Sequence, residues 1–105
     1  MIDTKQNEFP MKALIYHGIR DVKLQEKELP VCGPDDVIVR NMRAGICGTD
    51  MHCYREHIPG SGFIKGTILG HELSGVIDET GKGVIGLKPG DRVVVEPLIR
   101  CKECN

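Results

Sequence analysis

The feature that most constrains the fold is a series of short β-type segments separated by glycine and proline. Apolar or β-branched runs occupy residues 12–18, 36–46 and 86–97. Runs of this kind between turn-forming residues are typical of a mainly β chain. The 13 glycines and 6 prolines supply the tight turns that such a chain requires. With 105 residues, the chain is long enough for one domain with a modest core.

Two segments depart from the strand pattern. Residues 48–56 contain little β-branching, and Thr49 or Asp50 could cap a short helical turn there. The first ten residues, MIDTKQNEFP, are polar and unpatterned, so we expect residues 1–10 to form a flexible extension. The remaining residues, 11–105, are expected to form the folded domain.

Local packing and pairing are also predicted from the pattern. Val37, Val39 and Met42 belong to a strand-like run and are expected to face the core. In the segment KPGDRV, Gly90 is expected to make a turn, and Asp91 and Arg92 are expected to form a local hydrogen bond or ion pair.

Composition excludes several functional classes. The chain has 14 basic and 15 acidic residues and no Lys/Arg cluster, which argues against nucleic-acid binding. Its apolar runs are too short to span a bilayer, and its N-terminus lacks the apolar stretch of a signal peptide, so a cytoplasmic, membrane-free protein is expected. In that reducing compartment, an odd number of cysteines, five, favours metal ligation, catalysis or burial over disulfides.

A set of metal-binding residue types lies in two neighbouring segments, GICGTDMHCY (45–54) and ILGHELSGVI (68–77). Catalytic zinc is commonly held by three protein ligands of mixed Cys, His and carboxylate type. Cys47, His71 and Glu72 offer that set. The residues alone leave a second interpretation open, in which Cys47 is a small buried apolar residue and His71 a hydrogen-bonded core histidine.

The chain ends on a Cys-x-x-Cys pair, Cys101 and Cys104. Two thiolates do not complete a tetrahedral zinc site, so we expect a domain that is incomplete at its C-terminus. The alternative interpretation is a tail with two free thiols.

Three motifs, GICGTDMHCY, GHELSGV and KPGDRVVVEP, occur in an order and at a spacing that resemble the zinc-dependent medium-chain alcohol dehydrogenases. The resemblance runs from Met11 to Asn105 and is stronger for the sorbitol and threonine dehydrogenase branch. It implies a mainly β fold, a GroES-like, partly open β-barrel with short helical turns. The resemblance also implies that the chain stops before a Rossmann domain, which would bind the dinucleotide.

The resemblance assigns metal ligands residue by residue. Cys47 and His71 match the first two ligands of the catalytic zinc. Glu72 matches a glutamate that binds this zinc directly in sorbitol-dehydrogenase-like members and approaches it transiently in others. Cys101 and Cys104 match the first half of a structural zinc lobe of four cysteines.

The resemblance also assigns catalytic roles around the metal. Asp50 matches an acid that hydrogen-bonds the ligand histidine and fixes its tautomer. Thr49 matches a hydroxyl that takes the proton from the alcohol substrate, and His52 matches a histidine that passes the proton towards solvent. The simpler alternatives are that Thr49 is a helix cap and His52 an exposed polar residue.

The implied function is that of the N-terminal zinc-binding part of an oxidoreductase. The parent enzyme would oxidise a small secondary alcohol, polyol or hydroxy amino acid by hydride transfer to NAD or NADP, as a homodimer or homotetramer. The 105 residues alone should be inactive, because no G-x-G-x-x-G follows a strand; GKGVIG (81–86) only imitates its glycines. The alternatives are a stand-alone GroES-like interaction module and a structural zinc or dithiol module.

Overall fold

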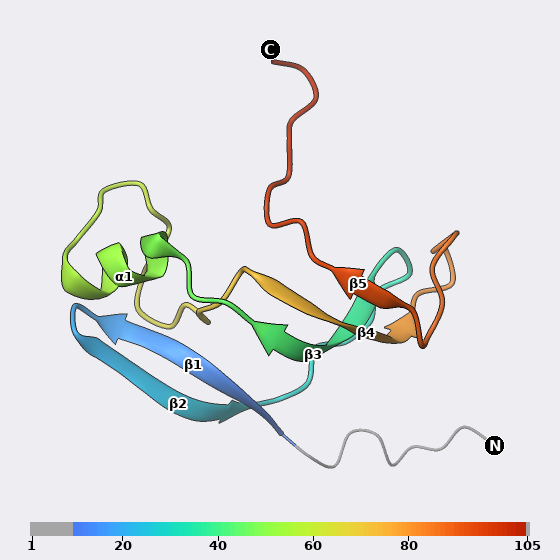
Figure 1. Ribbon diagram of the computed structural model, residues 1–105, viewed down its shortest axis with the longest axis horizontal. Coiled ribbons are helices and arrows are strands. Elements are labelled where there is room, and N and C mark those ends of the chain that lie inside the picture. The colour runs from blue at the N-terminus through green and yellow to red at the C-terminus, as the bar shows by residue number, and fades with distance from the viewer. Residues whose placement is uncertain (1–9, 105) are drawn as a thin grey trace. The chain divides into compact units, whose positions relative to one another are not determined.

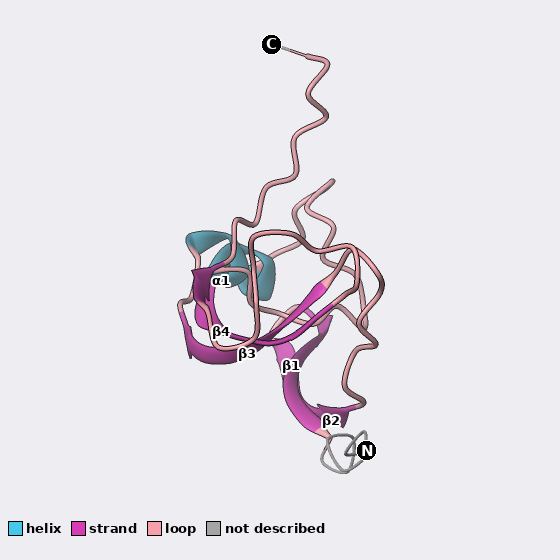
Figure 2. Ribbon diagram, turned by 90° about the vertical axis from the view of Figure 1, so that its right-hand side faces the viewer, coloured by secondary structure: helices cyan, strands magenta, loops and turns pink. Residues whose placement is uncertain are grey.

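The computed structural model describes residues 10–104, and the predicted extension over residues 1–10 lies outside this range except for Pro10. The described residues form mostly strands and loops with a single helix, which confirms the predicted mainly β class (Figure 2). In chain order the elements are β1 (Met11–Gly18), β2 (Asp21–Lys27), β3 (Val37–Ala44), α1 (Gly48–Arg55), β4 (Leu73–Thr80) and β5 (Arg92–Val94) (Figure 1).

The chain divides into two compact units. The hairpin unit combines residues up to Val31 with residues 46–70 and therefore holds β1, β2 and α1. The sheet unit combines residues 32–45 with residues from His71 onwards and holds β3, β4 and β5.

In the hairpin unit, β1 is an antiparallel partner of β2 and also hydrogen-bonds a later loop. The apolar strand predicted for residues 12–18 is present as β1, in which Ala13 and Ile15 are buried while Leu14 is exposed. On its other edge, β1 receives a hydrogen bond from the N–H of Leu69 to the carbonyl of Leu14, 2.8 Å long. The loop over 64–69 thus covers the edge that β2 leaves open.

Tyr16 joins the parts of the hairpin unit. Its ring meets the edge of Phe63, with the ring centroids 6.0 Å apart and the planes at 83°. Its hydroxyl donates a buried hydrogen bond of 3.2 Å to the carbonyl of Cys53 in α1. Tyr16 and Cys53 are both buried, so this contact fixes the helix against β1.

In the sheet unit, β4 is the central strand between β3 and β5, and all neighbours are antiparallel. Ile77 on β4 is 1% exposed and forms the centre of this unit's core. Val37 and Val39 are half-buried, in line with their predicted inward positions. The prediction for Met42 is wrong: its side chain is 48% exposed, because the pairing shifts between Asn41 and Arg43 and Met42 is the extra residue of a bulge.

The turn before β5 forms as predicted, but its ion pair has a different partner. Gly90 has a φ of 95°, a conformation that favours glycine. Asp91 pairs with Lys88 and not with Arg92: Nζ of Lys88 lies 2.8 Å from Oδ1, and the Lys88 N–H donates to Oδ2 over 3.0 Å. These hydrogen bonds from Lys88 lower the pKa of the Asp91 carboxyl, and the Asp91 carboxylate raises the pKa of Lys88.

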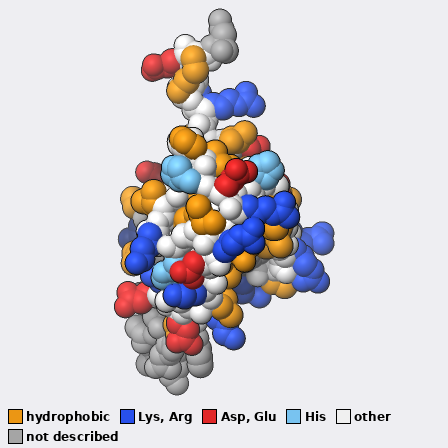
Figure 3. All heavy atoms as spheres, turned by 90° about the vertical axis from the view of Figure 1, so that its left-hand side faces the viewer, with side chains coloured by type: hydrophobic (Ala, Val, Ile, Leu, Met, Phe, Trp, Pro, Cys, Tyr) orange, Lys and Arg blue, Asp and Glu red, His pale blue; other side chains and the backbone are white. Residues whose placement is uncertain are grey.

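The surface is mixed in character. On the face drawn in Figure 3, Lys and Arg side chains are interspersed with acidic and hydrophobic ones. Among the residues that the structure describes, no helix is long and apolar enough to cross a membrane.

Candidate metal centre

Helix α1 begins directly after Cys47, and its first turn organises three of the predicted site residues. Oδ2 of Asp50 accepts a hydrogen bond of 3.1 Å from the N–H of Cys47. The carboxylate thus satisfies a backbone donor at the helix start, where negative charge is favourable. The N-cap residue is Cys47, so neither Thr49 nor Asp50 occupies the predicted cap position. Asp50 contributes to the capping box from the third residue of the helix.

Thr49 instead lies beside the predicted ligand sulfur. The Cys47 thiol is 3.6 Å from Oγ1 of Thr49. His52 follows Thr49 by three residues in α1, and residues at this spacing share one side of a helix. Both Thr49 and His52 are exposed, whereas Cys53 faces inward and is 1% exposed. The helix therefore presents the hydroxyl and the imidazole on a solvent-accessible side.

His71 and Glu72 lie in the sheet unit, immediately before β4. The carbonyl of Glu72 accepts a hydrogen bond of 2.8 Å from the N–H of Gly45. A Cβ at Gly45 would lie 3.1 Å from Oε2 of Glu72, so the carboxylate would have to shift slightly to admit a side chain there. The sequence motif contains Gly45, but only the structure reveals that it makes room for Glu72.

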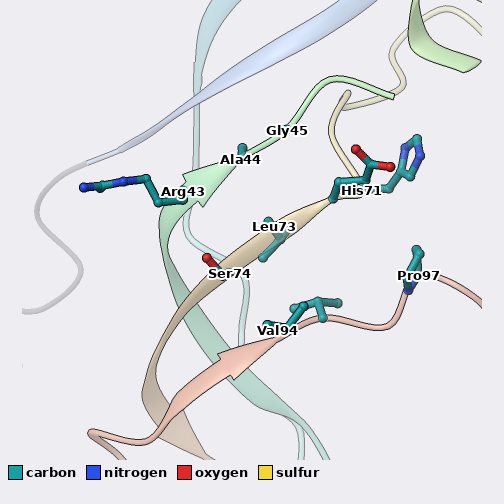
Figure 4. Close-up of a pocket in the computed structure, with 10 residues that line it drawn as sticks. Arg43, Ala44, Gly45, His71, Leu73, Ser74, Val94 and Pro97 are labelled. Carbon is teal, nitrogen blue, oxygen red and sulfur yellow. The ribbon is translucent and has the colours of Figure 1, made fainter. Parts of the chain in front are cut away.

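A hollow of about 520 Å³ opens beside these two residues (Figure 4). His71 is half-buried and Glu72 is exposed at one end, while Leu73, Val94 and Pro97 line the apolar remainder. The side chain of Arg43 extends away from His71 (Figure 4). The hollow thus joins an apolar wall to an imidazole and a carboxylate.

The predicted catalytic ligands divide between the two units. Cys47 belongs to the hairpin unit, and His71 and Glu72 belong to the sheet unit. The structure brings His71 and Glu72 together as neighbours at the start of β4. The meeting of all three ligands around one metal ion stays a prediction.

The Cys-x-x-Cys pair converges after β5. The sulfur atoms of Cys101 and Cys104 lie 2.7 Å apart, and both residues are exposed. The hydrogen bond with Cys104, assisted by backbone N–H groups, lowers the pKa of Cys101 to about 7. A thiol of this kind is readily deprotonated, as metal ligation requires. The other cysteine of the sheet unit, Cys32, has a pKa raised chiefly by burial, and its thiol donates to the carbonyl of Asp36 over 3.4 Å.

The glycines of GKGVIG have a packing role. This segment lies in the loop between β4 and β5, and no helix follows it among the described residues. The N–H of Gly81 donates to the carbonyl of Asp36, and the N–H of Gly83 donates to the carbonyl of Pro34. A Cβ on Gly81 would collide with the carbonyl of Gly33, so glycine is required for this loop contact.

Comparison with known proteins places the chain in a family. Residues 33–105 match the alcohol dehydrogenase GroES-like domain. The chain belongs to this family. The predicted membership in the zinc-dependent medium-chain alcohol dehydrogenases, on the sorbitol-dehydrogenase-like side, is confirmed.

The relatives of this GroES-like domain are polyol and alcohol dehydrogenases. Sorbitol dehydrogenase from Homo sapiens is 44% identical over 87 residues, which cover 81% of this chain and 24% of the relative. Sorbitol dehydrogenase from Bacillus subtilis is 40% identical over 96 residues, covering 90% and 27%. The chain thus spans about a quarter of the length of these relatives.

Solved structures show the same fold. Zinc dependent alcohol dehydrogenase 2 from Streptococcus pneumonia has a TM-score of 0.76 at 36% identity, covering 90% of this chain and 27% of that protein. The alcohol dehydrogenase rspB from Escherichia coli CFT073, complexed with the cofactor NADH, has a TM-score of 0.76 at 37% identity, with the same coverage. These matches confirm the predicted GroES-like fold.

Proposed function

We propose that this chain is the N-terminal zinc-binding part of an oxidoreductase that oxidises a secondary alcohol, polyol or hydroxy amino acid by hydride transfer to NAD or NADP. The observation that carries the proposal is the placement of His71 and Glu72 immediately before β4 in a chain of the alcohol dehydrogenase family. The Glu72 carbonyl accepts a hydrogen bond from the N–H of Gly45 in the GICGTD motif. Relatives named as sorbitol dehydrogenases and as a zinc dependent alcohol dehydrogenase support the substrate class and the metal.

The residues present fit a zinc ion. A thiolate from Cys47, an imidazole from His71 and a carboxylate from Glu72 form a donor set that zinc prefers. All three residues lie in the segment that matches the alcohol dehydrogenase GroES-like domain, and this match supports a shared site.

A bound zinc supplies the Lewis acidity that lowers the pKa of an alcohol towards neutrality. The residues of the chain then move the proton. The Thr49 hydroxyl accepts it beside the Cys47 sulfur, and His52 carries it from the exposed side of α1 to solvent. Asp50 holds the Cys47 backbone at the helix start and, in this proposal, orients His71.

The hydride acceptor binds elsewhere in this proposal. A relative complexed with NADH supports a nicotinamide cofactor for the whole protein. Residues 11–105 form the GroES-like catalytic domain, and by themselves they do not transfer hydride. Cys101 and Cys104 contribute to a second, structural zinc. A cytoplasmic location and a dimeric or tetrameric parent remain predictions.

The zinc content of the whole protein tests this function. We expect Cys47→Ser to lose one zinc per chain together with dehydrogenase activity, because the first ligand is removed. Cys32→Ser is the matched control, since Cys32 is half-buried, lies in the sheet unit and has no predicted ligand role. Unchanged zinc and activity in Cys47→Ser would show that Cys47 is structural and that the proposed mechanism is wrong.

A further inference from the structure

The register of the sheet unit places two arginines on one face of the sheet. Arg43 on β3 pairs with Ser74, which pairs with Val94 on β5. Arg92 on β5 pairs with Val76. Directly opposed residues of antiparallel strands project to the same face, as do residues two apart on one strand. These five side chains therefore share one face.

A hollow of about 510 Å³ lies along this face. Its walls include both guanidinium-bearing residues, Arg43 and Arg92, and the hydroxyl of Ser74 between them on the central strand. Val76 and Val94 supply apolar surface, and Val94 is 82% exposed. The hollow therefore combines three groups that can donate hydrogen bonds with an adjoining apolar wall.

The charge at this hollow is unbalanced. Arg40 pairs with Val76 in the register and shares the same face, but its Nε lies 3.6 Å from Oδ1 of Asp78. Among the described residues, no carboxylate forms an ion pair with Arg43 or Arg92. Arg43 uses one donor, Nη1, on the carbonyl of Met42, and a guanidinium carries five.

We propose that this hollow binds a small organic oxyanion, a phosphate or carboxylate with an apolar substituent. Strands β3 and β5 are two strand spacings, roughly 10 Å, apart, and Arg43, Ser74 and Arg92 all line the hollow. Arg43 and Arg92 hold the oxyanion by charge-assisted hydrogen bonds, and the Ser74 hydroxyl donates a third. The substituent lies against Val76 and Val94.

Binding of phenyl phosphate, benzoate and inorganic phosphate to the 105-residue chain tests this site. Titration calorimetry at low salt is expected to give roughly 10-fold tighter binding of phenyl phosphate than of inorganic phosphate, because the ring covers apolar surface. The probe that binds more tightly, phenyl phosphate or benzoate, identifies the preferred head group. Val94→Thr should reduce the affinity advantage of phenyl phosphate over inorganic phosphate and leave the binding of inorganic phosphate unchanged.

Charge-matched variants separate this site from general electrostatic attraction. Arg43→Gln and Arg92→Gln are each expected to weaken phenyl phosphate binding about fivefold, as the loss of an exposed charged contact implies. Arg55→Gln in α1 removes the same charge from the hairpin unit and should have little effect. Equal weakening by all three variants, or no measurable binding of any probe, would overturn the proposal. Circular dichroism of each variant verifies that the fold is retained.

Discussion

Gly75 on β4 pairs with Asn41 on β3, and its replacement by alanine tests how closely the two strands pack. A Cβ added at Gly75 would collide with the carbonyl oxygen of Arg40 and lie 2.7 Å from Cγ1 of Val39. The carbonyl belongs to the neighbouring backbone, which the sheet ladder holds in place. It cannot rotate away as a flexible side chain would, so Gly75→Ala must push β3 and β4 apart.

The expected cost follows from this geometry. An added methyl group in a close-packed interior destabilises a protein by about 1–3 kcal/mol. Alanine also restricts the unfolded chain, which returns about 0.4–1 kcal/mol. Gly75→Ala should therefore lower the free energy of unfolding by roughly 1–2 kcal/mol. For a domain of this size the melting temperature falls by about 4–8 °C per kcal/mol.

Thermal unfolding followed by circular dichroism measures this effect, with Gly48→Ala as the control. No heavy atom lies within 4 Å of a Cβ built at Gly48, which is in α1. Alanine is the better helix former, so Gly48→Ala should raise the free energy of unfolding by about 0.5–1 kcal/mol. A Gly75→Ala chain that melts at or above the wild-type temperature would refute the argument from close approach of the strands.

Two further predictions concern a buried hydrogen bond and a surface ion pair. Tyr16→Phe removes the buried hydrogen bond to the carbonyl of Cys53 and should cost about 1 kcal/mol in denaturant unfolding; an unchanged midpoint would contradict this. The pKa of Asp91 is lowered by Lys88, so the stabilisation from this pair is present above the unfolded pKa and is lost as pH falls through the folded pKa. In a carbon-13 NMR titration, Lys88→Gln should raise the pKa of Asp91 towards its ordinary value, whereas Lys82→Gln should not, and equal titration curves in both variants would count against the ion pair.

The strands were predictable from the sequence because local signals agree with the tertiary environment. The run over 12–18 is apolar and ends at Gly18, and β1 covers this run. The errors occurred where the outcome depends on a neighbouring strand or a rotamer. A bulge turns Met42 outward, and the turn brings Lys88 rather than Arg92 to Asp91. Neither the bulge nor the choice of ion-pair partner leaves a local sequence signal.

The candidate site was predictable as residue types but not as an arrangement. The motif predicts Glu72 as a metal ligand, yet the position of Glu72 depends on the pairing of Ala44 with Leu73 across a connection of more than twenty residues. That register is set by the buried face of β4, where Ile77 points into the core. A slip of one residue would move Ile77 to the opposite face, so the core strongly specifies the pairing.

This dependence links the stability of the sheet to the chemistry proposed for the metal centre. The hydrogen bond from Gly45 to Glu72 continues the β3–β4 ladder just beyond its last pair. A change that separates these strands, such as Gly75→Ala, should therefore shift Glu72 and weaken zinc binding, although residue 75 contributes no ligand atom. If a Gly75→Ala variant loses stability but keeps full zinc affinity, the position of Glu72 before β4 does not depend on the strand packing at residue 75.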